Sequence, residues 1–102
     1  MTASIHSILE GNDCLSIYID GRFDYQAIQL FTNAYTHVSP RPKSYCIDLS
    51  KAESLDSTAL ALLLMLRRHA GDQHSKIILK NPNEDVHKVL KIAMIDSLFI
   101  IQ

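Results

Sequence analysis

The sequence predicts an α/β domain with a mostly parallel central sheet, because strand-like and helix-like segments alternate along most of its length. Two further observations support this prediction. Short polar connections join the segments, and the first two strand-like segments form a hairpin ahead of the alternation. The expected order of elements is ββαβαβαβ, within one domain that spans residues 1–102.

Two strands are expected at the start of the chain, over residues 4–9 and 14–20. In the second of them apolar and polar side chains alternate, which is the pattern of a strand with one buried face. Turn-forming residues 10–13 lie between the two strands, so the pair is predicted to form a hairpin. Residues 20–24, Asp-Gly-Arg-Phe-Asp, are expected to end the second strand.

A helix is expected from about Tyr25 to Val38, because apolar residues recur there at helical spacing. Pro40 and Pro42 prevent its continuation. Residues 44–49, almost all apolar or β-favouring, predict a strand that is buried on both faces. The aromatic residues of the helical segment are assigned to core packing: Tyr25, Phe31 and Tyr35.

A polar loop over residues 50–56 leads into a second helix, which begins at Ser57 and Thr58 and continues through eight apolar residues in succession. This helix is expected to be buried and to end at residues 67–69, since basic side chains complement the partial negative charge of a helix C-terminus. The remaining predicted elements are a strand over residues 76–80, a helix with an apolar stripe from Val86 to Met94, and a short strand over residues 98–101.

Composition and charge exclude several classes of function. The chain has 10 Lys+Arg against 11 Asp+Glu, so it lacks the positive surface that nucleic-acid binding requires. It shows no signal-peptide pattern and no apolar run near the roughly 18 residues of a membrane span, so we expect a cytoplasmic protein without membrane insertion. Cys14 and Cys46 lack the spacing of metal ligands and are expected to be small buried free thiols.

Three enzyme classes fit the sequence poorly. A serine hydrolase would need the G-x-S-x-G turn, which the residues around Ser57 do not form. The 3 glycines cannot form a phosphate-binding glycine-rich loop. A carboxylate pair of Asp24 and Asp56 would need a deep cleft, for which 102 residues leave no room. We therefore expect no enzymatic activity, no catalytic residues, no cofactor and no metal.

The most informative stretch is residues 46–60, which runs from a buried strand through a loop into a helix. It places the hydroxyls of Ser57 and Thr58 at a helix N-terminus, where unpaired N–H groups and the helix dipole favour negative charge. A phosphate on Ser57 would therefore be compatible with the fold. The residues by themselves favour a plainer interpretation, in which Asp56 or Ser57 only caps the helix.

Two motifs resemble those of STAS domains, the anti-sigma factor antagonists of bacterial partner-switching systems. Residues 56–60, Asp-Ser-Thr-Ala-Leu, preceded by Ile-Asp-Leu-Ser at 47–50, are similar to the family's D-S-[ST]-[GA]-[LMV] signature. Residues 21–24, Gly-Arg-Phe-Asp, are similar to its G-x-[LF]-D turn. The order of elements and the length also fit the family across essentially the whole chain.

The resemblance implies that Ser57 is the serine that a cognate kinase phosphorylates, with Thr58 as the alternative acceptor. It also implies that Asp24, in the turn after the second strand, lies near this site. Ala59 stands where Gly is commoner in the family. The implied surround of the phosphorylation site, which would also bind the partner, consists of Gly21, Asp24, Asp56, Thr58 and Ala59.

The resemblance further implies an anti-sigma factor antagonist that binds an anti-sigma factor, typically a serine kinase, and releases it when Ser57 is phosphorylated. A PP2C-type phosphatase would reset the switch. A phosphoserine carries about −1.5 to −2 charges at pH 7 and, beside Asp56, would repel a docked partner. The alternative is a STAS-like accessory subunit of a membrane transporter, such as a lipid-transport ABC system, without a phospho-switch. The kinase, the downstream output and the oligomeric state stay open.

Overall fold

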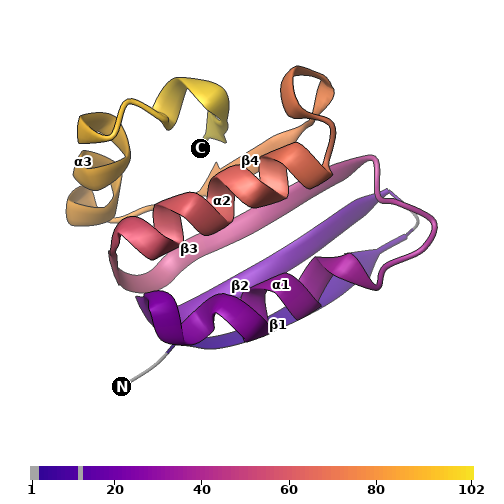
Figure 1. The fold of residues 1–102 in the computed structure, drawn as a ribbon, viewed down its shortest axis with the longest axis horizontal. Coiled ribbons are helices and arrows are strands. Elements are labelled where there is room, and N and C mark those ends of the chain that lie inside the picture. Colours follow the sequence, from indigo (N-terminus) through magenta and orange to yellow (C-terminus); the bar gives the residue numbers. More distant parts are fainter. Residues whose placement is uncertain (1–2, 12) are drawn as a thin grey trace.

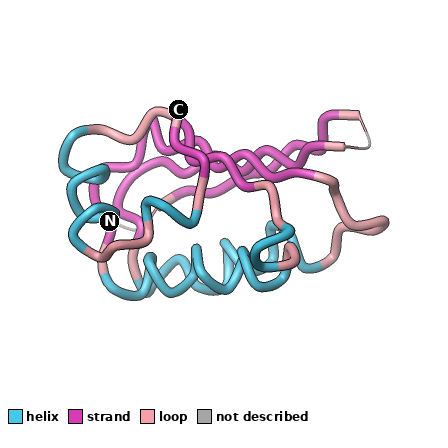
Figure 2. Tube along the Cα trace, turned by 90° about the horizontal axis from the view of Figure 1, so that it is seen from above, coloured by secondary structure: helices cyan, strands magenta, loops and turns pink. Residues whose placement is uncertain are grey.

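A five-stranded mixed sheet forms one layer of the molecule, and helices α1 and α2 lie side by side across one of its faces (Figure 1, Figure 2). The computed structural model describes residues 3–11 and 13–102. The strands are β1 (Ser4–Glu10), β2 (Cys14–Phe23), β3 (Ser44–Leu55), β4 (Ile77–Lys80) and β5 (Ile100–Ile101). The α-helices are α1 (Ile28–Thr36), α2 (Ser57–His69) and α3 (Glu84–Ile92), and 3-10 turns lie at Tyr25–Ala27, Asp72–His74 and Asp96–Leu98.

The strands are arranged in the order β1-β2-β3-β4-β5. β1 is antiparallel to β2, and every later pair of neighbours is parallel. Parallel neighbours need a crossover, and α1, α2 and α3 supply the three crossovers. The predicted α/β fold, an N-terminal hairpin followed by helix–strand pairs around a mostly parallel sheet, is therefore confirmed.

The core lies between the sheet and the helices, and the opposite face of the sheet carries no helix within the described residues (Figure 2). Alternate side chains of β2 and β3 enter the core, as the period of a strand requires. The prediction that residues 44–49 are buried on both faces is wrong, because Cys46 and Asp48 are only half-buried on the helix-free face. The fully buried strand residues include Leu15, Ile17, Ile19, Tyr45, Ile47 and Leu49.

Two other predictions of burial are wrong. Cys14 and Cys46 are free but only half-buried, because both project from the face that the helices leave open. Tyr25 is 61% exposed, whereas Phe31 and Tyr35 are buried as expected. The reason is that Tyr25 belongs to the 3-10 turn ahead of α1 and does not continue the apolar stripe of that helix.

β2 and β3 extend beyond their predicted ends. The expected break at residues 20–24 and the expected loop at residues 50–56 are instead a ladder that continues until Phe23 pairs with Leu55. Its register shifts twice, and Gly21 has a φ of 104°, which L side chains rarely adopt. Long-range pairing thus overrides the local turn signals, and a glycine lets the strand continue through the irregularity.

Candidate partner-binding site at the start of helix α2

Two aspartate-capped turns meet where β2 and β3 end. Asp24 follows β2 and precedes the 3-10 turn, and Asp56 follows β3 and precedes α2. The Asp56 N–H donates to the Phe23 carbonyl oxygen at 3.3 Å, and Phe23 is paired with Leu55. The parallel pairing of two strands therefore brings together turns that are far apart in sequence.

Asp56 is the N-cap of α2. Its backbone is extended, with φ −104° and ψ −177°, and its Oδ1 accepts a hydrogen bond from the Ala59 N–H at 2.8 Å. An aspartate here satisfies one of the N–H groups that a helix start leaves unpaired, and the negative charge suits the helix dipole. Of the two capping residues that the sequence allows, Asp56 caps the helix and Ser57 is left as its first residue.

Asp24 is the N-cap of the three-residue 3-10 turn that follows β2. Its backbone is extended, with φ −138° and ψ −169°, and its Oδ1 accepts from the Gln26 N–H at 3.0 Å. Its carbonyl oxygen accepts from the Ala27 N–H at 2.9 Å, which closes the 3-10 turn. The turn that carries Asp24 is thus held rigidly beside the turn that carries Asp56.

The two hydroxyls at the start of α2 differ in their exposure. Ser57 is exposed, Thr58 is half-buried, and Ala59 is completely buried in the core. Ser57 is therefore the more accessible of the two predicted acceptors, and Ala59 supports the turn from beneath. Gly21 is half-buried and pairs with Ala52 inside the β2–β3 ladder, so it shapes the strand behind the turn and does not form part of the turn itself.

Helix α2 exposes an apolar stripe that begins at Ser57. Ala61, Leu64 and Met65 follow Ser57 at helical spacing and are exposed, with Leu64 at 38% and Met65 at 54%. The prediction of a buried helix is wrong for this stripe, because eight consecutive apolar residues conceal which side faces the sheet. The core side of the helix is formed by Ala59, Leu62, Leu63 and Leu66.

Asn83 connects a third strand end to this region and is a residue that sequence reasoning missed. Its Oδ1 accepts from the Val86 N–H at 2.8 Å as the N-cap of α3, and its Nδ2 donates to the Ala52 carbonyl oxygen at 3.1 Å. The sequence signal is an asparagine directly before two acidic residues and an apolar stripe. Its amide thereby fixes the start of α3 against the extended end of β3.

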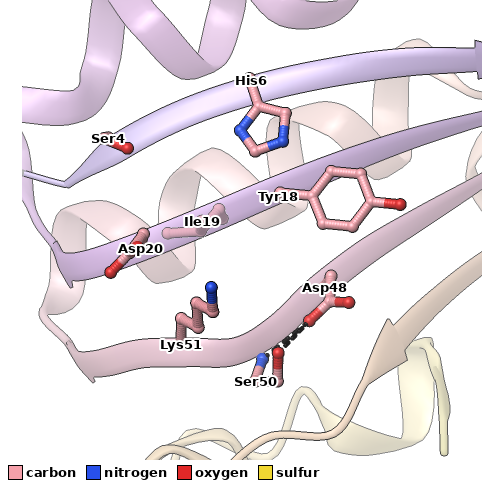
Figure 3. Close-up of a pocket in the computed structure, with 8 residues that line it drawn as sticks. All are labelled: Ser4, His6, Tyr18, Ile19, Asp20, Asp48, Ser50 and Lys51. Atoms are coloured by element: carbon pink, nitrogen blue, oxygen red, sulfur yellow. Dashed lines mark hydrogen bonds between the residues drawn. The ribbon is translucent and has the colours of Figure 1, made fainter.

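Asp48 and Ser50, which lie in the stretch that precedes the signature, occupy a different place. They line a shallow depression of about 250 Å³ on the helix-free face, together with His6, Tyr18 and Lys51 (Figure 3). The Asp48 Oδ1 accepts from the Ser50 N–H at 2.9 Å and from the Ser50 hydroxyl at 2.6 Å. Burial raises the pKa of Asp48, but the hydrogen bonds from Ser50 and the nearby lysines outweigh it, so the pKa lies below its ordinary value.

Residues 3–11 and 13–102 contain no group of three or more His, Cys, Asp or Glu side chains placed to hold a metal ion. In the same part of the chain, α2 and the other helices fall short of a membrane-spanning segment. The features of the site around Ser57 are its hydroxyl, the two capping aspartates Asp24 and Asp56, and the exposed stripe of α2.

Comparison with known families identifies the fold. A family model described as "Mlab, STAS domain" matches residues 8–101. The chain belongs to the STAS domain family. This STAS domain is 46% identical, over 85 residues, to a STAS-domain containing protein of Pseudomonas aeruginosa (strain UCBPP-PA14), and the match covers 83% of this chain and 84% of that protein.

Solved structures share the STAS architecture at low sequence identity. The anti-sigma factor antagonist SpoIIAA in its unphosphorylated form aligns with a TM-score of 0.82 at 18% identity, covering 97% of this chain and 88% of that chain. The Bacillus SpoIIAA in its phosphorylated form aligns with a TM-score of 0.71 at 16% identity, covering 97% and 91%. A sulfate transporter family protein from Wolinella succinogenes aligns with a TM-score of 0.74 at 13% identity, covering 89% and 75%.

Proposed function

We propose that this STAS domain is an anti-sigma factor antagonist whose partner docks around Ser57 and dissociates when Ser57 is phosphorylated. The observation that carries the proposal is an exposed serine at the first position of α2, at one end of an exposed apolar stripe. Membership of the STAS family and the likeness to SpoIIAA, which is known in both unphosphorylated and phosphorylated forms, support it. The domain acts by binding and not by catalysis.

Phosphorylation of Ser57 adds charge without unfolding the domain. The N-terminus of α2 stabilises a nearby anion by about 0.3–1 kcal/mol, which offsets part of the repulsion from Asp56. The cap between Asp56 and Ala59 involves a carboxylate and a backbone N–H, so the Ser57 hydroxyl is not needed to hold the helix. We therefore expect the same fold before and after phosphorylation.

The docked partner covers the stripe of Ala61, Leu64 and Met65 and approaches Ser57 at its end. Exposed apolar residues in a continuous row are typical of an interaction surface. A phosphate at Ser57 introduces a dianion beside Asp56 at this surface, and a repulsion of about 3 kcal/mol lowers the affinity roughly a hundredfold. Release then follows from charge and steric exclusion at the interface.

The partners in this proposal are an anti-sigma factor with serine kinase activity and a PP2C-type phosphatase, both acting in the cytoplasm. The surround of Ser57 comprises Asp24, Asp56 and Thr58 on the two turns, with Gly21 and Ala59 supporting them from the ladder and the core. Thr58 is the weaker candidate for phosphorylation because it is half-buried. The whole chain, residues 1–102, acts as one STAS domain.

A second function has an observation in its favour. The Wolinella sulfate transporter family protein shares this architecture, so the chain could instead be an accessory subunit that docks onto a membrane transporter, such as a lipid-transport ABC system. In that case Ser57 and Thr58 form part of a permanent interface and are never phosphorylated. The genes beside this one discriminate between the two functions, because a kinase and a phosphatase support the switch and a permease and an ATPase support the subunit.

The test of the proposal is incubation of the purified protein with a candidate serine kinase from the same organism and ATP, followed by intact-mass measurement and peptide mapping. One phosphate should appear, on Ser57. Ser57→Ala should abolish the modification, and Thr58→Ala, the matched control, should retain it. Absence of phosphate, or phosphate on a residue other than Ser57 or Thr58, would contradict the switch.

A further inference from the structure

The two edge strands of the sheet, β5 and β1, differ in length. β5 has two residues, and such short edge strands offer little template for another strand. β1 has seven residues and pairs with β2 along its whole length. Within residues 3–11 and 13–102 no strand pairs with the outer edge of β1. This edge therefore presents a row of backbone N–H and C=O groups to solvent.

β1 lacks the features that normally keep an edge strand from pairing with another chain. Its sequence, Ser-Ile-His-Ser-Ile-Leu-Glu, has no proline and no lysine, and its register with β2 has no bulge from Ser4 to Glu10. Two of its apolar side chains are substantially exposed, Ile8 at 48% and Leu9 at 42%. A long, regular and partly apolar edge of this kind favours pairing with a further strand.

We propose that β1 pairs in antiparallel fashion with β1 of a second copy of this chain, about a two-fold axis that passes through Ile8. The side chains of His6 and Glu10 favour this register, because an imidazole N–H donates a hydrogen bond to a carboxylate whether or not the ring is charged. With the axis at Ile8, each Ile8 lies opposite its counterpart, and each His6 lies opposite Glu10 of the other copy. An axis one residue earlier, at Ser7, would place His6 opposite Ile8 and Glu10 opposite Ser4, so both ionisable groups would face uncharged side chains.

The side chains in this register also share one face. His6 and Glu10 lie on the helix-free face. His6 lines the shallow depression described above, and Glu10 lines a second depression beside Cys14 and Cys46. Ile8 lies between them at the strand period of two. The His6 ring stacks on Tyr18, with ring centroids 4.9 Å apart and an angle of 12° between the planes (Figure 3). This stacking orders the imidazole on the helix-free face, over β1 and β2.

The paired copies would form one continuous sheet. α2 packs over the part of the sheet away from β1, so the surface around Ser57 stays open in both copies (Figure 1). The inference does not depend on the proposed phospho-switch. A domain that dimerises through β1 can still bind a partner through α2, and either property can fail without the other.

The first test is the mass of the unmodified protein in solution, measured by sedimentation equilibrium across the micromolar range. A dimer is expected. His6→Glu places like charges opposite each other twice and should weaken the dimer by about tenfold or more in dissociation constant. The double variant His6→Glu/Glu10→Lys restores opposite charges and should recover most of the affinity. A monomeric wild-type protein, or a double variant no better than His6→Glu, would overturn the proposal.

The second test determines the register between the two β1 strands by disulfide cross-linking under mild oxidation. It uses a protein in which Cys14 and Cys46 are replaced by serine. Ile8→Cys should form a covalent dimer, because a residue on the axis lies opposite its own counterpart at a Cβ separation of about 5 Å. Ser7→Cys is the matched control and should cross-link poorly. Faster cross-linking of Ser7→Cys, or none with Ile8→Cys, would overturn the register.

Discussion

The turn after β2 and the turn after β3 begin in the same way and then diverge. Each contains an aspartate in extended conformation whose Oδ1 accepts a backbone N–H, from Gln26 at 3.0 Å in the first and from Ala59 at 2.8 Å in the second. After Asp24 the chain makes a 3-10 turn of three residues before it enters α1, whereas after Asp56 it enters the 13 residues of α2 directly. Capping is therefore shared, and it does not by itself mark a functional site.

What distinguishes the second turn is its exposed serine and the apolar stripe on the helix behind it. Thirteen residues align enough peptide dipoles to favour an anion at Ser57, and the same helix carries the exposed stripe that ends at this serine. The turn after Asp24 also leads into a helix, because α1 follows its three residues directly, but it has no hydroxyl at the matching position, where Tyr25 stands. The difference teaches that the hydroxyl at the first position of α2 and the exposed side of this helix, more than its cap, make Ser57 a candidate switch.

The largest expected effect is on partner binding. Ser57→Asp should weaken binding of the anti-sigma factor by up to about a hundredfold, because it places a negative charge beside Asp56 at the docked surface. Ser57→Ala should bind like the wild type. Gln26→Asp adds the same charge to the other turn and should weaken binding less. Isothermal titration calorimetry measures all three, and equal affinities for Ser57→Asp and Ser57→Ala would contradict the mechanism.

A smaller effect on binding is expected from the stripe of α2. Met65→Ala removes the most exposed large side chain of the stripe that starts at Ser57 and should weaken binding by about tenfold. The matched control is Ile28→Ala, which shortens a side chain of similar exposure on α1, the helix that follows the turn of Asp24. A greater loss for Ile28→Ala would move the docking surface from α2 to α1.

Asp56→Ala should lower the free energy of unfolding by about 1 kcal/mol, since it leaves the Ala59 N–H at the start of α2 without its cap. Urea denaturation with a fluorescent or circular dichroism signal measures this loss. Ser57→Ala is the control and should stay within about 0.5 kcal/mol of the wild type. A destabilisation by Ser57→Ala as large as that by Asp56→Ala would show that the serine has a structural role.

The smallest expected effect is that of Asp24→Ala. The 3-10 turn that it caps has three residues and is followed directly by α1, so fewer N–H groups depend on this carboxylate. We expect a loss of a few tenths of a kcal/mol up to about 0.5 kcal/mol, below that of Asp56→Ala under the same conditions. A larger loss in the free energy of unfolding for Asp24→Ala than for Asp56→Ala would contradict the expectation that the cap of α2 contributes more to stability.

Much of the fold could be predicted because local patterns suffice for it. The alternation along β2 and the stripe along α3 each determine a type of element, and the residues at the start of α2 predict a helix N-terminus. The exposed side of α2 could not be predicted, because Leu63 and Leu64 are identical in sequence terms and differ only in which faces the sheet. Periodicity carries no information within a uniformly apolar run.

By itself, the sequence determined the order of the elements, the aspartate–serine motif at residues 56–57 and the nearly balanced net charge, because each depends on neighbours in the chain or on composition. Only the tertiary structure decided that β2 and β3 continue as paired strands to Phe23 and Leu55, that the turns of Asp24 and Asp56 meet, and that Ser57 is exposed. These features depend on hydrogen bonds and packing between residues distant in sequence. These contacts stabilise the chain only once the sheet has assembled, so no local sequence pattern predicts them.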